Sequence, residues 1–167
     1  SGIKGQAISA LTTKTGLSDD DIVSFAAGRD GALWLGTIRG GLNRWKDGKV
    51  TVYGVANGLP DPSVVALLGR PDGSLWIGHR GAGLTRFQDG RFFRYGAREG
   101  LRSPYVWEIA EGRDGTLWIG TDGGGVNWLR NGAITTLTTK QGLSHDSVYA
   151  FLEDRDGSMW IGTGAGL

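Results

Sequence analysis

Short apolar runs separated by Asp-Gly pairs recur along the whole chain. The run Ile22–Ala26 is followed by Asp30-Gly31 and then by Leu33–Thr37. An Asp-Gly pair between two apolar runs predicts a β-hairpin, because both residues tolerate the positive φ that a type I′ turn requires. We therefore expect two antiparallel strands joined by a tight turn over residues 22–37.

A second hairpin is predicted directly after the first. Leu42–Trp45 and Val50–Tyr53 flank Asp47-Gly48, and the later equivalents of this turn are Asp89-Gly90 and Asn131-Gly132. Two consecutive hairpins make a four-stranded antiparallel meander, which is the structural unit that this pattern predicts.

The unit recurs with a period of 42 residues along the chain. Gly-Leu pairs begin at Gly16, Gly58, Gly100 and Gly142. Asp-Gly pairs begin at Asp30, Asp72, Asp114 and Asp156, and a tryptophan follows each pair at Trp34, Trp76, Trp118 and Trp160. Because internal repeats decide the fold, we interpret residues 1–167 as one domain with repeats of about 1–42, 43–84, 85–126 and 127–167.

The second strand of each unit indicates how the units pack. Leu75–Ile77 and Leu117–Ile119 are apolar at every position, so both faces of the sheet must be buried. Sheets covered on both sides by copies of themselves stack radially, as the blades of a β-propeller do. We expect the four repeated tryptophans to lie in this core, each contributing about 4–6 kcal/mol of gross burial energy. The fold class is all-β.

The two ends of the chain complement one another. The loop Thr163–Leu167 is one residue shorter than Thr37–Leu42, so the chain stops on the first residue of a third strand. Residues 1–4 align with residues 43–46, the remainder of that strand. This alignment predicts that one blade is split between the termini, which would close a ring without open sheet edges.

Two ways of closing such a ring remain open. Four blades could close alone, or two chains could each complete the other's split blade to give eight blades. Four blades would leave wide wedges to fill, yet the innermost strands carry small side chains at Ser24, Ala66 and Ala150. We therefore expect a homodimeric eight-bladed ring, with a stand-alone four-bladed propeller as the alternative.

Composition and charge exclude several classes of protein. The chain has no cysteine, and 18 Lys/Arg against 17 Asp/Glu leave a formal charge of +1. This balance gives no reason to expect a nucleic acid or an anionic membrane as a partner. No apolar run approaches the length of a membrane span. The start at Ser1-Gly2-Ile3 is typical of a processed or engineered boundary.

The recurring pattern Gly-Leu … Val … Asp-Gly-x-Leu-Trp-Ile-Gly-Thr … Gly-Gly-Leu resembles the two-component-regulator propeller repeat. It is clearest from Ser147 to Thr163, and the departures are His79 for Thr, Ala82 for Gly and Val126 for Leu. The resemblance extends over all four units. Because four units are fewer than that family's usual seven blades, we interpret the chain as a fragment or an engineered chain.

The resemblance also implies a function and a location. Such repeats form the periplasmic or extracytoplasmic sensor part of membrane-bound histidine kinases and diguanylate cyclases. Their ligands are thought to include glycans. The chain has no kinase, cyclase or membrane-spanning segment of its own. We therefore expect a non-catalytic binding or scaffold module, whose partners are a second copy of itself and a glycan or small extracellular ligand.

Candidate ligand-binding residues lie in the loops that converge at one end of a propeller. Polar residues there differ between units, so a ligand site must be asymmetric within the chain. The candidates are Arg39, His79, Arg80, Glu108, Asp122 and His145. His79 stands where the other units have Thr and suits a hydrogen-bonding substitute, whereas Glu108 would need solvent or a cationic partner.

Neither a metal site, a cofactor nor a catalytic residue is predicted. Asp154–Gly157 begins like a calcium loop but runs straight into a strand, and Gly123–Gly125 lacks the helix of a phosphate-binding loop. The enzyme alternative is a propeller lyase that would use His79 or His145, the two histidines of the chain. A pure scaffold that binds no ligand is the third alternative.

Overall fold

The computed structural model describes residues 2–4 and 7–167, and all their regular structure is β-strand apart from four 3-10 turns. The strands are β1 (Gly2–Lys4), β2 (Ala7–Ser9), β3 (Ile22–Ala27), β4 (Leu33–Thr37), β5 (Leu42–Lys46), β6 (Lys49–Tyr53), β7 (Val64–Gly69), β8 (Leu75–His79), β9 (Leu84–Gln88), β10 (Arg91–Tyr95), β11 (Val106–Glu111), β12 (Leu117–Thr121), β13 (Val126–Arg130), β14 (Ala133–Leu137), β15 (Val148–Glu153) and β16 (Met159–Thr163). The 3-10 turns are η1 (Thr13–Thr15), η2 (Val55–Asn57), η3 (Ala97–Glu99) and η4 (Thr139–Gln141).

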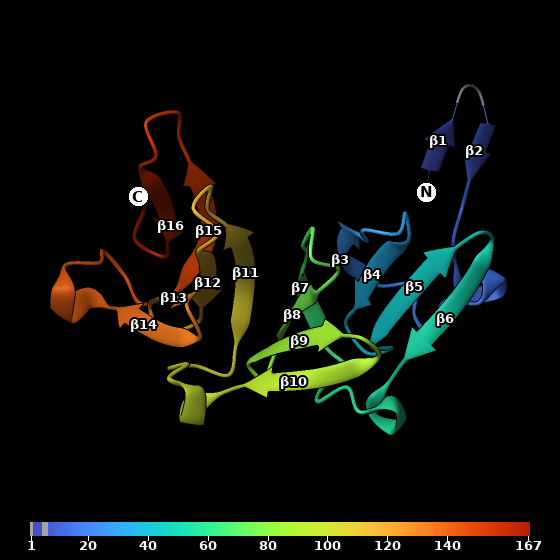
Figure 1. Ribbon diagram of the computed structural model, residues 1–167, viewed down its shortest axis with the longest axis horizontal. Helices are drawn as coiled ribbons and strands as arrows, with labels where there is room; N and C mark the ends of the chain where they lie inside the picture. The colour runs from blue at the N-terminus through green and yellow to red at the C-terminus, as the bar shows by residue number, and fades with distance from the viewer. Residues whose placement is uncertain (1, 5–6) are drawn as a thin grey trace.

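Three complete blades and two half-blades make up the fold (Figure 1). The strands β3–β6, β7–β10 and β11–β14 each form a four-stranded antiparallel meander, as predicted. The strands β15 and β16 form a two-stranded sheet, and so do β1 and β2. The two half-blades lie on opposite sides of the molecule in Figure 1, so the blades form an open arc.

The register of the half-blades confirms that one blade is split between the termini. In the β1–β2 hairpin, Ile3 pairs with Ile8 and Lys4 pairs with Ala7. In the complete β5–β6 hairpin, the aligned pairs are Trp45 with Val50 and Lys46 with Lys49. The β15–β16 pair has the bulged register of β3–β4. The N-terminal hairpin is therefore the outer half of a blade, and β15–β16 is the inner half.

The two hairpin turns of a blade differ in their geometry. In the outer turn, Asp47 has a φ of 49° and Gly48 a φ of 77°, as a type I′ turn requires. In the inner turn, only Gly31 has a positive φ. Asp30 instead accepts a hydrogen bond from the Ala32 backbone at 3.2 Å. The type I′ prediction for the inner turn was wrong, because the loop there is longer: the Gly31 N–H donates to the Gly28 carbonyl at 3.1 Å, and the Gly28 N–H donates to the Ala32 carbonyl at 2.8 Å.

The predicted tryptophan column is buried only where another blade follows. Trp34 and Trp76 are 7% and 3% exposed, and Trp118 is half-buried. Trp160 is 50% exposed, contrary to the prediction that all four lie in the core. Trp34 packs against Phe87 of the third strand of the next blade, with the ring centroids 5.5 Å apart. Trp118 meets Phe151 of a half-blade, and no blade follows Trp160 among the described residues.

Glycines in the second strand allow neighbouring blades to come into contact. A methyl group placed on Gly78 would lie 2.7 Å from Val106 Cγ1, on the next blade. One placed on Gly36 would similarly clash with Val64. Val64 and Val106 are fully buried at these contacts. The second strand of a blade therefore has no room for a side chain here.

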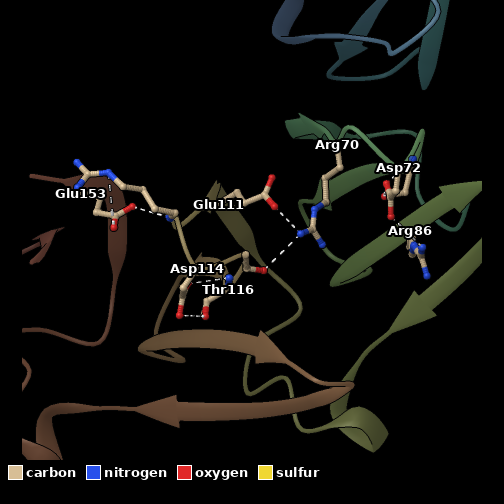
Figure 2. A network of polar contacts seen from close by, with 10 residues as sticks. Arg70, Asp72, Arg86, Glu111, Asp114, Thr116 and Glu153 are labelled. Atoms are coloured by element: carbon tan, nitrogen blue, oxygen red, sulfur yellow. Dashed lines mark hydrogen bonds and ion pairs between the residues drawn. The ribbon is translucent and has the colours of Figure 1, made fainter. Parts of the chain in front are cut away.

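Polar contacts join the same pairs of blades at both ends of the molecule. At one end, Arg70 forms an ion pair with Glu111 on the next blade (Figure 2), and the Arg113 backbone N–H donates to Glu153 at 2.8 Å. At the other end, the backbone N–H of Gly41 donates to Pro62 at 2.9 Å. The equivalent bonds from Gly83 and Gly125 measure 2.8 and 2.7 Å.

Replacing Gly78 by Ala should lower the free energy of unfolding by about 1–3 kcal/mol, because the added methyl group overpacks the contact with Val106. Urea unfolding followed by tryptophan fluorescence would measure this loss. Gly54→Ala is the matched control, since Gly54 has open space around it and an ordinary φ of −114°. An equal effect of the two substitutions would contradict the packing argument.

Candidate functional site

The candidate site lies where two sets of loops meet. The inter-blade loops are residues 54–63 and 96–105, which connect consecutive complete blades, and residues 138–147, which connect the third complete blade to the half-blade β15–β16. The equivalent segment 10–21 precedes β3. The mid-blade loops, residues 38–41, 80–83 and 122–125, connect the second and third strands, and the equivalent segment 164–166 follows β16. Backbone hydrogen bonds between Gly41 and Pro62, and between Gly83 and Pro104, hold the two sets together across adjacent blades.

Most polar residues of the inter-blade loops are engaged in building the loops. Asp19 and Asp61 each accept a hydrogen bond from the backbone N–H two residues later, at 3.1 and 2.7 Å. His145 forms the same turn, because the Ser147 N–H donates to its Nδ1 at 2.9 Å. Asp20 and Asp146 accept hydrogen bonds from the starts of the 3-10 turns. These side chains therefore shape the loops.

Two predicted site residues, Asp122 and His145, are brought together through Ser147. The Ser147 hydroxyl donates to Asp122 at 2.6 Å, while its backbone N–H donates to His145. In this bond Nδ1 of the imidazole is the acceptor. Arg39 lies apart from this group and is highly exposed. It forms ion pairs with Asp21 at 2.5 Å and Asp19 at 3.6 Å.

His79 is a structural residue of the blade core. Its side chain is 0% exposed, and Nε2 forms a hydrogen bond with Thr85 at 3.0 Å. Burial lowers the pKa of His79 to about 4, so the imidazole is neutral at physiological pH. The equivalent Thr37 and Thr121 donate to mid-blade carbonyl groups instead. The hydrogen-bonding role expected for His79 agrees with this geometry.

Arg80, Tyr105 and Trp107 form an aromatic and basic cluster at the junction of the second and third complete blades. The guanidinium carbon of Arg80 lies 5.8 Å from the centre of the Trp107 ring, within cation–π range. Arg80 and Tyr105 also form an isolated antiparallel bridge. Arg80 and Tyr105 are exposed, whereas Trp107 is half-buried and its indole N–H has no hydrogen-bond partner. We refer to these three residues as the Arg80 cluster.

Sequence reasoning selected Arg80 but missed both aromatic residues. A signal was present in the repeat itself. Position 105 is Asp or Ser in the other three units, and position 107 is Val, Val or Tyr. Comparing equivalent positions of the four units would have singled out Tyr105, because it is an aromatic residue at a loop end where the other units have Asp or Ser.

Glu108 lies next to the Arg80 cluster in the sequence. It is half-buried, and burial raises the pKa of its carboxyl group. Burial is the only cause of this shift, and over residues 2–4 and 7–167 the Glu108 carboxylate has no hydrogen-bond or ion-pair partner, so the expected cationic partner is not found there. A carboxyl group without a protein partner remains available to a ligand or to water.

The stability of the fold should fall by about 2 kcal/mol between pH 7 and pH 5 because of His79. The pKa of His79 is about 4 in the folded protein and 6.5 in the unfolded chain, so only the unfolded state gains a proton as the pH drops below 6.5. Burial of the neutral His79 therefore does not lower the free energy of unfolding above that pH, and lowers it progressively as the pH falls from 6.5 towards 4. Urea midpoints measured across this range would show it.

His79→Thr, which introduces the residue of the other three units, should remove most of that pH dependence. His145→Ser is the control, because Ser103 forms the same loop turn in another unit. If His79→Thr and the unsubstituted chain lost stability in parallel, His79 would not be the titrating group.

Comparisons with known proteins address the repeat and the fold. The model of the family described as "Two component regulator propeller" matches residues 16–39, 100–123 and 142–165. The match covers three of the four units, and the unit that contains His79 lies outside it. No curated protein sequence matches the chain significantly. No helix in the described part of the chain is long and apolar enough to cross a membrane.

Solved structures resemble the chain at low sequence identity. The extracellular domain of a protein assigned as a hybrid two component system from B. thetaiotaomicron is 20% identical, with a TM-score of 0.84 over 95% of this chain and 23% of that chain. Virginiamycin B lyase from Staphylococcus aureus is 20% identical, with a TM-score of 0.68 over 86% of this chain and 49% of that chain. PorZ from Porphyromonas gingivalis is 20% identical, with a TM-score of 0.68 over 90% and 25%.

The chain spans less than a quarter of the length of the first of these structures. At such identities the likeness establishes the fold, and the repeat motifs establish the type of blade. The chain has the fold of β-propeller blades, and three of its four units match the two component regulator propeller repeat.

Proposed function

We propose that the chain is a non-catalytic binding module of an extracytoplasmic sensor, with the Arg80 cluster as its ligand-contacting site. The observation that carries this proposal is the Arg80 guanidinium stacked on a half-buried Trp107 whose indole N–H has no partner. The likeness to the extracellular domain of a protein assigned as a two component system supports the location.

The chemistry of the cluster favours a sugar that carries a carboxylate. The exposed ring of Tyr105 and the exposed part of Trp107 offer apolar surface to a sugar ring. The Arg80 guanidinium suits a carboxylate, because it can donate two parallel hydrogen bonds. We therefore propose an acidic glycan as the ligand class.

A glycan array that includes uronate-containing oligosaccharides would test this ligand class. We expect binding to acidic members, reduced about 10-fold or more by Arg80→Ala and by Trp107→Ala, since a charge-assisted contact is worth about 1.5–3 kcal/mol. Arg91→Ala is the control, because Arg91 is an exposed arginine on an outermost strand. Absence of binding to every member would favour a pure scaffold.

A lyase-type enzyme is the alternative, and the likeness to virginiamycin B lyase is the observation that favours it. The geometry of the two histidines argues against it. His79 is fully buried with a lowered pKa, and Nδ1 of His145 is held in a loop turn. A lyase activity of the purified protein that disappeared on changing both histidines to Ala would favour the enzyme.

We also propose that the 167-residue chain closes its ring with a second copy, giving a homodimer with eight blades. The matching registers of the two half-blades support this assembly, because one chain holds both halves of a blade in separate sheets. Multi-angle light scattering over a concentration series should give twice the 17.7 kDa of one chain. A mass of 17.7 kDa at every concentration would exclude the dimer and favour a four-bladed monomer.

A further inference from the structure

We infer that the open end of the arc at β16 binds the open end at β3 of a second copy, through a contact that the chain already makes three times internally. We call Leu152, Trp160, Gly162 and Leu167 the front face, and Ile22 and Phe25 the back face. The inference rests on the proposed homodimer and specifies which surfaces form it.

The front face is apolar and uncovered. Leu152, Trp160 and Leu167 are 66%, 50% and 80% exposed. Together with Ala150, Phe151 and Gly162, they line a groove of about 380 Å³. The residues aligned with Leu167 in two complete blades, Leu42 and Leu84, are fully buried. Because the same positions are covered elsewhere in the chain, the front face has the composition of a blade interior.

The back face carries the residue type that covers a front face. Phe25 is 73% exposed, although its equivalents in later units pack against the preceding blade. Ile109 is 5% exposed within a core cluster that includes Trp76, and the Phe151 ring lies 6.2 Å from the Trp118 ring. Phe25 therefore lacks the tryptophan that its position contacts in the other blades.

The strand glycines fit the same arrangement. A methyl group placed on Gly120 would lie 3.1 Å from Val148 Cγ1 on the next blade. The three atoms nearest to one placed on Gly162 all belong to Ala150 in its own sheet, at 3.3 Å or more. Ile22 is the back-face residue that aligns with Val148, and it is half-buried whereas Val148 is fully buried. In the proposed contact, Ile22 of one copy fills the space beside Gly162 of the other, as Val148 fills the space beside Gly120.

The β1–β2 hairpin supplies the edge that β16 lacks. In a complete blade, Leu33 of the second strand pairs with Trp45 of the third. The aligned residues are Met159 of β16 and Ile3 of β1, and these two strands lie on opposite sides of Figure 1. When the front face of one copy meets the back face of another, the β1–β2 hairpin of the second copy lies beyond β16 of the first and completes its four-stranded sheet.

A second copy is the occupant because each chain offers one front face and one back face that are complementary. Two chains then form two identical front-to-back contacts, and the ring closes with a two-fold axis. A dimer that paired the two back faces with each other would instead leave Trp160 and Leu167 exposed in both chains. The three internal contacts are all front-to-back.

The test measures the mass of single-face variants by light scattering. Phe25→Glu places a charge on the back face, and Leu152→Lys places one on the front face. Each should raise the dissociation constant of the dimer about 100-fold or more, because burying an unpaired charge opposes the contact. Both residues are more than half exposed in the single chain, so the blades should keep their fold. Phe93→Glu, on the outer strand β10, is the control and should remain dimeric.

Mixing the two variants provides the sharper test. A heterodimer of Phe25→Glu with Leu152→Lys has one unchanged contact, while the other places the introduced carboxylate against the introduced ammonium group. We therefore expect two variants that are monomeric alone to form a dimer when mixed. Only a front-to-back arrangement gives this rescue. A dimer that persists in both variants, or variants that stay monomeric when mixed, would overturn the inference.

The outcomes separate this inference from the proposals on which it rests. If the unsubstituted chain is dimeric and Phe25→Glu does not weaken it, the homodimer stands and the assignment of its faces is wrong. If the unsubstituted chain is monomeric at every concentration, both are wrong. Circular dichroism and the glycan array on the monomeric variants show whether the fold and the Arg80 cluster persist independently of assembly.

Discussion

The contact between the second strand of one blade and the first strand of the next is the interaction on which the structure depends. It combines a tryptophan, a glycine that leaves room for a neighbouring valine, and hydrogen bonds at the loop end. A four-stranded meander has two apolar faces and cannot bury both by itself. Stacking along this contact buries the facing sheet surfaces three times within the chain. Trp160, which has no following blade among the described residues, is 50% exposed.

The loop end of the molecule shows how a repeated framework accommodates local change. His145 replaces an aspartate or serine in a loop turn and makes the same hydrogen bond through Nδ1. His79 replaces a threonine, and its neighbour Thr85 stands where two other units have asparagine. The backbone remains similar in both cases. Residues that look like candidate catalytic groups in the sequence thus perform the structural work of the residues they replace.

The blade pattern could be predicted from the sequence because the repeat displays each hairpin four times. Alignment of the termini even placed β1 and β2 in their correct register. Three features could not be predicted. Trp160 lies in the same column as Trp76, and only the position of the next blade distinguishes its exposure. Asp30 and Asp47 both precede glycine, yet only Asp47 adopts a positive φ. The pairing of Arg80 with Trp107 depends on two loops from different blades, which no local pattern relates.

The internal contacts have a consequence for how such proteins vary in size. Every described contact between complete blades involves adjacent blades only, in the manner of solenoid repeats, where stability is a sum over units and nearest-neighbour interfaces. The contacts that a blade makes therefore do not depend on the total number of blades. A duplication or deletion of one whole unit, made at any inter-blade loop, would leave each surviving interface with the same chemical partners.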